Sequence, residues 1–215
     1  SELQRRGVHA LTVRSPLDCL SRKGTCAHCF GLDEHGHLPQ VGDNLGAKSG
    51  QTMSEPLTQL TMRSFHTGGV AGKGPVIAQG FERIRQLLRM PEHVAGKATL
   101  AEIAGRVSSV KGTPTGGHEV LVGGKMHALR PGLTPRVKAG DVVQAGDLLS
   151  DGILKPQELL QHKGMRAAQD YIAGELQRAY HEQGVPMQRR ILETVVRSFG
   201  NQTRVVGVPK HGDFH

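Results

Sequence analysis

Residues 51–74 form the segment QTMSEPLTQLTMRSFHTGGVAGKG, and the rest of the chain is organised around it. Ser54 is a residue type that caps helices, and Pro56 is tolerated in a first helical turn, so a helix is predicted to begin here. No residue between Leu57 and Phe65 interrupts it. Residues at i, i+3, i+4 and i+7 share one face of this helix, namely Gln59, Met62, Arg63 and His66.

That face combines an amide, a thioether, a guanidinium and an imidazole. Together these groups can hold a planar base, contact phosphate oxygens and move a proton. Glycines follow the helix at positions 68, 69, 72 and 74, and glycine admits many backbone conformations. We therefore expect the end of the helix to fold and unfold. The plainer alternative is an ordinary amphipathic helix followed by a loop, and spacing alone favours it.

The composition is that of an irregular, basic chain. Its 215 residues suffice for one or two domains, but only 37% are hydrophobic and 29 are glycine, so we expect a loop-rich piece that leans on a partner. The formal net charge of +8 suits a polyanion such as nucleic acid, although ribosomal and membrane-surface proteins share it. No apolar run approaches the ~18 residues of a transmembrane helix, so no membrane partner is predicted. The chain opens with Ser1 rather than Met, as a processed chain or a fragment would.

The cysteines are spaced Cys19-x6-Cys26-x2-Cys29. Thiolates are the preferred ligands of structural zinc, so a C-x-x-C pair with a third cysteine nearby is strong evidence for a zinc site. Four ligands are normally needed, and the chain has 3 cysteines. The fourth ligand could be a histidine at position 28, 35 or 37, or it could come from another segment. The alternative is three thiols without a metal.

Residues 55–72, EPLTQLTMRSFHTGGVAG, resemble the trigger loop of the largest catalytic subunit, β′, of bacterial-type multisubunit DNA-directed RNA polymerase. The match is long and nearly ungapped, and it is far more specific than a short motif. The resemblance extends over most of the chain, from about Gly7 to Asp213.

The resemblance implies roles for the shared helical face. In the family the trigger loop folds over the incoming nucleoside triphosphate and closes the active site. Arg63 and His66 are therefore expected to be catalytic and to reach the phosphates. Gln59 is expected to bind the ribose, and Met62 to pack on the base. The sequence leaves open whether His66 donates a proton or only positions the phosphates.

The cysteine segment, residues 13–33, resembles the second zinc site of the same family. There the fourth ligand is a cysteine far upstream. The resemblance thus implies a structural zinc ion bound by Cys19, Cys26 and Cys29 together with a ligand from outside this chain. His28 lies between two of these ligands and is expected to point away.

Two segments depart from the family pattern. Residues 36–50 are polar and glycine-rich where the family has an apolar helix, so a weaker helix is expected there. Residues 188–190 are Gln-Arg-Arg where the family has Asp-Lys-His. These departures indicate a divergent member of the family, such as a phage or split-subunit enzyme.

We expect an α+β fold that is not an independent compact catalytic unit. Its four parts are a zinc-binding segment, a trigger-loop helical hairpin, a small β-barrel, and C-terminal helices with a final strand, at residues 1–40, 41–98, 99–153 and 154–215. The alternating run 8–14 predicts a further short strand. Strand patterns separated by a turn at 112–117 and by Gly123-Gly124 predict the barrel.

Helical periodicity predicts three C-terminal helices, at residues 156–164, 166–183 and 187–199. The expected buried residues of the second are Ala168, Ile172, Leu176, Ala179 and Tyr180. Those of the third are Ile191, Leu192, Val195, Val196 and Phe199. In the returning arm of the hairpin they are Ile84, Leu87 and Leu88.

None of the aspartates forms the Asp-x-Asp-x-Asp cluster that binds catalytic magnesium in this family. The chain is therefore expected to be part of a DNA-directed RNA polymerase, a nucleotidyltransferase, with Mg held by other segments. The implied partners are other polymerase subunits, DNA template, RNA and nucleoside triphosphates, in the cytoplasm or, for a virus, the host cytoplasm. One alternative is a stand-alone zinc-ribbon module that binds nucleic acid without catalysis. Another is a biotinyl or lipoyl carrier, which the barrel and Lys125-Met126 faintly resemble.

Overall fold

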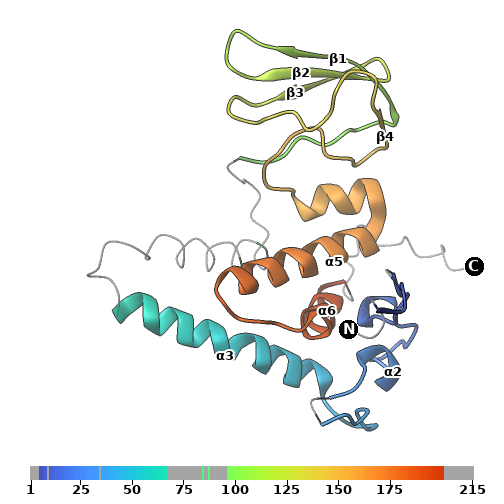
Figure 1. The fold of residues 1–215 in the computed structure, drawn as a ribbon, viewed down its shortest axis with the longest axis vertical. Coiled ribbons are helices and arrows are strands. Elements are labelled where there is room, and N and C mark those ends of the chain that lie inside the picture. The colour runs from blue at the N-terminus through green and yellow to red at the C-terminus, as the bar shows by residue number, and fades with distance from the viewer. Residues whose placement is uncertain are drawn as a thin grey trace, which may run out of the picture. The chain divides into compact units, whose positions relative to one another are not determined.

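The computed structural model describes residues 5–8, 10–33, 35–66, 84, 87 and 96–200. Its helices and sheet make the chain an α+β protein, as predicted (Figure 1). The chain divides into two compact units, and the division falls between Glu55 and Pro56. The first unit also takes in the chain from Gln188 onward. The predicted glycine-rich loop after His66 and the predicted final strand both lie outside the described residues.

Short helices build the first unit around the cysteines. The 3₁₀ helix η1 spans Pro16–Asp18, and α2 spans Ala27–Phe30. The longer helix α6, Arg189–Phe199, packs against η1 although it lies far along the chain. Ser15 caps η1, because its hydroxyl accepts a hydrogen bond from the Leu17 N–H at 3.0 Å.

The strand predicted for residues 8–14 is wrong, because the described residues of this run form no strand. Leu11 and Val13 are 65% and 70% exposed. A strand needs a neighbour to satisfy its backbone groups, and no described strand pairs with this run. Alternation of apolar and polar residues is therefore not sufficient to form a strand here.

Helix α3 spans Leu45–His66 and starts earlier than predicted. Asn44 caps it, because the Asn44 Oδ1 accepts a hydrogen bond from the Ala47 N–H at 2.9 Å. The prediction that Ser54 is the cap is wrong, since Ser54 lies inside the helix and its hydroxyl donates to the Gly50 carbonyl at 2.8 Å. Pro56 also lies inside the helix rather than in its first turn.

A four-stranded antiparallel sheet occupies the segment predicted as a small β-barrel. Its strands are β1 Gly105–Gly112, β2 His118–Val122, β3 Lys125–Leu129 and β4 Val142–Val143. They lie in the order β3-β2-β1-β4, and the sheet is curled (Figure 1). The predicted Gly123-Gly124 turn joins β2 to β3, where Val122 pairs with Lys125. Both glycines have positive φ, 53° and 86°, as the two central residues of a type I′ hairpin turn require.

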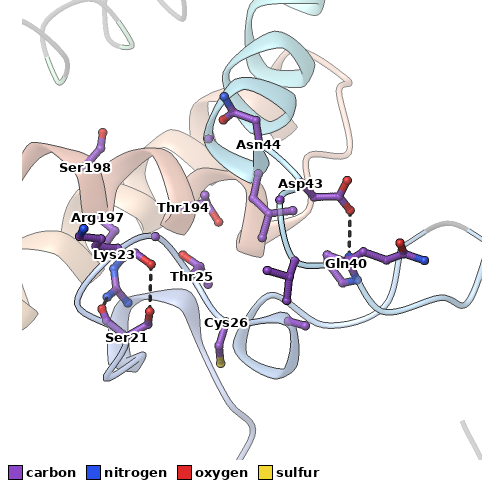
Figure 2. Close-up of a pocket in the computed structure, with 17 residues that line it drawn as sticks. Ser21, Lys23, Thr25, Cys26, Gln40, Asp43, Asn44, Thr194, Arg197 and Ser198 are labelled. Atoms are coloured by element: carbon purple, nitrogen blue, oxygen red, sulfur yellow. Dashed lines mark hydrogen bonds between the residues drawn. The ribbon is translucent and has the colours of Figure 1, made fainter.

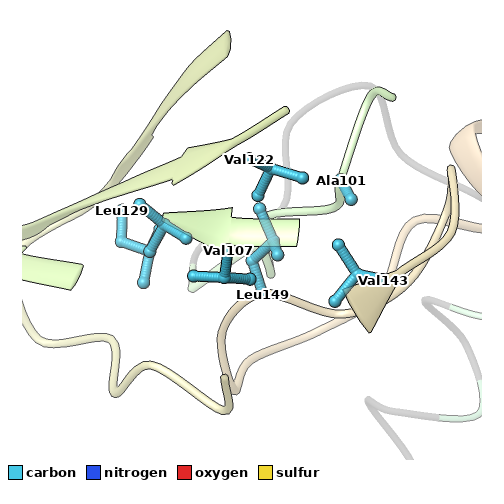
Figure 3. Close-up of a cluster of buried hydrophobic side chains, with 7 residues drawn as sticks. Ala101, Val107, Val122, Leu129, Val143 and Leu149 are labelled. Atoms are coloured by element: carbon cyan, nitrogen blue, oxygen red, sulfur yellow. The ribbon is translucent and has the colours of Figure 1, made fainter. Parts of the chain in front are cut away.

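Aliphatic side chains fill the core beneath this sheet (Figure 3). They come from all four strands, from the segment before β1 and from the segment after β4. The buried set is Ala101, Val107, Val120, Val122, Leu129, Val143 and Leu149. No aromatic residue belongs to this set, in agreement with the low aromatic content of the chain.

Helix α5 spans Pro156–Glu182, and Gly164, at φ 81°, breaks it into the two predicted pieces. Every residue expected to be buried in its longer piece is buried. In α6, Leu192 and Val196 are buried as predicted, but Phe199 is 46% exposed and Glu193 is only 5% exposed. Ile84 and Leu87 are each 2% exposed, as predicted, and Leu88 lies outside the described residues.

Candidate functional site

Two short helices bring the cysteines together. Cys19 directly follows η1, and Cys26 is the residue that precedes the first turn of α2, which contains Cys29. The Cys26 N–H donates a hydrogen bond to the Cys19 sulfur at 3.3 Å. Cys19 is buried, while Cys26 and Cys29 are half-buried. This hydrogen bond thus brings the two ends of the Cys19–Cys26 loop together.

The three Sγ atoms all lie within 4.8 Å of one another. Zn–S bonds of ~2.3 Å in a tetrahedral site place sulfurs about 3.8 Å apart, so these thiols fit three corners of a zinc tetrahedron after small adjustments. In the part of the chain that the structure describes, they are the one group of three or more potential metal ligands. His28, His35 and His37 do not belong to it.

The thiols differ in acidity. Burial opposes ionisation of Cys19, but hydrogen bonds from backbone groups of Cys26 and Ser21 and from neighbouring thiols outweigh it and lower the pKa of Cys19 to about 7. Burial and the neighbouring Cys26 and Cys19 raise the pKa of Cys29 to about 11. The raised pKa of Cys29 means that its thiolate needs a cation nearby, and a zinc ion would supply that charge.

The cysteines also line a cavity of about 260 Å³, together with Arg14, Ser15, Asp18, Leu20 and Ser21. Since the candidate metal ligands are three sulfurs, the cavity leaves room for a further ligand to approach. This geometry is compatible with the predicted fourth ligand from outside this chain, which stays a prediction.

The four residues of the predicted substrate-binding face lie on the second half of α3, which runs unbroken through His66. Helical spacing places Gln59, Met62, Arg63 and His66 on one side of the helix. Their side chains lie outside the described part of the structure. Their grouping therefore rests on the helical backbone.

The cysteine segment, α6 and the start of α3 border one larger cavity, of about 750 Å³, within the first unit. Figure 2 shows Thr194 and Arg197 of α6 opposite Thr25 and Cys26, with Asn44 at the first turn of α3. The candidate metal centre and the start of the helix that carries the predicted substrate-binding residues therefore belong to one compact unit.

Sequence reasoning missed the charged residues of α6 that contact the cysteine segment. Arg190, Glu193 and Arg197 recur at i, i+3 and i+7, and this spacing was the available signal. The apolar periodicity of the same helix predicted only its opposite, hydrophobic side. Among the described helices, none is long and apolar enough to cross a membrane.

Comparison with known proteins places the chain in a family. A sequence model described as RNA polymerase Rpb1, domain 5, matches residues 6–115. The β′ subunit of DNA-directed RNA polymerase from Ureaplasma urealyticum serovar 10 is 35% identical over 220 residues, which cover 99% of this chain and 17% of that subunit. The corresponding subunit of Symbiobacterium thermophilum is 37% identical over 93% of this chain and 17% of its own length.

The β′ subunit of Desulforudis audaxviator is 38% identical over 217 residues, covering 96% of this chain and 18% of that subunit. The chain therefore spans less than a fifth of the length of these relatives. On the strength of the matched family and of these identities, the chain belongs to the RNA polymerase Rpb1 domain 5 family and represents the C-terminal part of a bacterial-type β′ subunit.

Proposed function

We propose that this chain supplies the trigger loop of a DNA-directed RNA polymerase, which closes over the incoming nucleoside triphosphate, and that it also carries a structural zinc site. One observation supports the first part most strongly. In a chain of this family, α3 continues without interruption from Leu45 to His66 and so gives the four predicted contact residues a common helical face.

In the proposed closed state, Gln59 binds the ribose and Met62 packs on the base. Arg63 and His66 reach the phosphates, where negative charge develops on the leaving pyrophosphate. Closure excludes water and places donors where that charge appears, which is a large source of rate enhancement. Magnesium ions held by other segments of the assembly would supply the charge that activates the attacking and leaving oxygens.

The proposal retains the four predicted parts of the chain. These are a zinc-binding segment at 1–40, a trigger-loop helical hairpin at 41–98, a small β-barrel at 99–153, and C-terminal helices with a final strand at 154–215. Cys19, Cys26 and Cys29 are the zinc ligands of this chain. The partners are other polymerase subunits or segments, DNA template, RNA and nucleoside triphosphates, in the cytoplasm.

Substrate contact by α3 can be tested in the assembled polymerase with Gln59→Ala and the matched variant Thr61→Ala. Thr61 follows Gln59 by two residues on the same helix, and this spacing places it off the proposed face. Gln59→Ala should raise KM for nucleoside triphosphates by about tenfold, the effect of losing roughly 1.4 kcal/mol of binding, and Thr61→Ala should leave KM unchanged. Equal KM values for both variants would argue against the assigned face.

The stand-alone zinc-ribbon function makes a different prediction. A chain with that function would copurify with DNA or RNA alone, whereas a polymerase part copurifies with large polymerase subunits. Mass spectrometry of material isolated from the native source separates the two, and the absence of polymerase subunits would overturn the proposal.

A further inference from the structure

Helix α6 presents a charged face to the cysteine segment. Arg190, Glu193 and Arg197 lie at i, i+3 and i+7 and so share one side of the helix. We call these three residues the α6 polar face. Glu193 is only 5% exposed, and buried charged groups are stable only where they are paired and hydrogen-bonded. Each of the three makes such contacts with residues on either side of the cysteines.

Arg197 fixes the backbone around Cys19. Its guanidinium donates hydrogen bonds to the carbonyl oxygens of Pro16 and Ser21, the second at 2.7 Å. The Pro16 carbonyl also accepts the N–H of Cys19 at 3.3 Å, and Ser21 lies in the loop that leads to Cys26. One planar guanidinium therefore holds the chain before and after the first cysteine, an arrangement that suits arginine because its donors form a rigid fork.

Arg190 does the same on the side of Cys29. It donates a hydrogen bond to the carbonyl oxygen of Leu32, and its guanidinium carbon lies 5.4 Å from the centroid of the Phe30 ring. Phe30 directly follows Cys29 and is the last residue of α2. A cation over an aromatic face and a charge-assisted hydrogen bond together restrain the end of the metal-binding segment.

Glu193 connects α6 to the start of the segment. It accepts hydrogen bonds from the Ser15 hydroxyl at 2.7 Å and from the Arg189 Nε at 2.8 Å. Ser15 caps η1, which ends immediately before Cys19. The contacts of the α6 polar face thus begin before Cys19 and end after Cys29, so they bracket the three cysteines along the chain.

The cysteine segment has little structure of its own. Its helices contain 3 and 4 residues, too few to hold three thiols at fixed positions. Many zinc segments of this size become ordered only when the metal binds, and part of the binding free energy is then spent on ordering. Here α6 provides an alternative source of order, from residues more than 150 positions away in sequence.

We propose that the α6 polar face is the positioning element of the metal centre, with Arg190 and Arg197 holding the cysteine segment ready for a zinc ion. This inference rests on the proposed zinc site. Neither arginine is a ligand. Each acts on backbone carbonyl groups next to the ligands and keeps the sulfurs close before the metal arrives.

The test measures the zinc dissociation constant of the full 215-residue chain by competition with a chelating indicator. Arg197→Gln and Arg190→Gln should each raise this constant about tenfold or more, since losing groups that orient metal ligands typically costs 10–100-fold in affinity. Arg197→Lys keeps the charge but can reach one carbonyl at a time, so an intermediate value is expected. The control is Arg178→Gln, which removes an exposed arginine of α5 that pairs with Glu175.

Cobalt substitution gives a second readout, because the intensity of the thiolate-to-cobalt charge-transfer band reports how many cysteines bind. The wild type and Arg178→Gln should show three thiolates, and Arg197→Gln fewer, with the far-ultraviolet circular dichroism of all chains alike. Unchanged zinc affinity in the Arg190 and Arg197 variants would overturn the positioning role while leaving the zinc site intact. A wild-type chain that binds no zinc would overturn the inference that α6 holds the segment ready for the metal, and the zinc content of the assembled enzyme would then test the site itself. Equal weakening by Arg178→Gln would show a nonspecific effect and also overturn the inference.

Discussion

At the scale of single residues, Asp147, which follows β4, pairs with Lys163 of α5. Its carboxylate forms an ion pair with the Lys163 Nζ at 2.5 Å and accepts a hydrogen bond from the Gln144 N–H at 2.8 Å. Lys163 and this N–H hold the pKa of Asp147 below its usual range, although burial opposes them. A carboxylate with a lowered native pKa stabilises the fold above its unfolded pKa, and this stabilisation is lost as the pH falls through the native pKa.

Asp147→Asn should therefore destabilise the chain near neutral pH, by about 0.5–1 kcal/mol because the pair is about one-third exposed. Urea unfolding of wild type and variant should show this difference shrinking as the pH is lowered through the acidic range. Lys163→Gln should remove most of the same contribution, and the double variant should be no worse than either single one. A difference that grows at acid pH would contradict the assignment.

At the scale of elements, the start of α3 can be tested by comparing the observed cap, Asn44, with the predicted cap, Ser54. Asn44→Ala should cost about 1 kcal/mol of stability, because the first turn loses its side-chain acceptor. Ser54→Ala should be nearly neutral, since the Ser54 hydroxyl only bonds back to the preceding turn and alanine favours helix. Urea unfolding and amide exchange at residues 47–50 measure both, and a larger loss for Ser54→Ala would restore the original cap prediction.

Elements with local causes could be predicted from the sequence. The Gly123-Gly124 hairpin turn needs only two residues with positive φ, and the break at Gly164 follows from the same property. The buried stripe of α5 follows from helical periodicity. The predicted strand at 8–14 failed because pairing depends on a neighbour that periodicity cannot supply.

In the candidate site, too, features with local causes could be predicted from the sequence and long-range contacts could not. The spacing of Cys19, Cys26 and Cys29 was sufficient to predict that three thiols would meet. The spacing of Arg190 and Arg197 indicates a charged helical face but not what that face contacts. Their acceptors are backbone carbonyls more than 150 residues away in sequence, and the side-chain pattern does not identify such acceptors.

At the scale of the whole molecule, the zinc content of the assembled enzyme tests whether another segment supplies the fourth zinc ligand. The assembled enzyme should contain one zinc per chain at this site, bound by Cys19, Cys26, Cys29 and a fourth ligand supplied from elsewhere. Elemental analysis should find that Cys26→Ser lowers the zinc content by one equivalent, while Ser21→Ala, in the same loop, leaves it unchanged. An assembly without zinc would contradict the metal centre.

The proposed role of α3 also belongs to the whole assembly, because this chain spans less than a fifth of the length of its relatives and is proposed to act with magnesium held by other segments. His66 ends the face that Gln59 begins, and so lies at the end of α3. If His66 only positions the phosphates, His66→Gln should keep much of the rate. If it donates a proton, glutamine should not replace it.

The most direct measurement is single-turnover nucleotide addition by the assembled polymerase on a preformed template–RNA scaffold, comparing wild type with His66→Ala and Arg63→Ala. Loss of one donor near developing negative charge commonly costs ~2.7–4 kcal/mol, so His66→Ala should slow addition roughly 100- to 1000-fold. Arg63→Ala should be at least as damaging, and template binding should stay unchanged in both. Wild-type rates in both variants would contradict the proposal that α3 closes over the nucleotide.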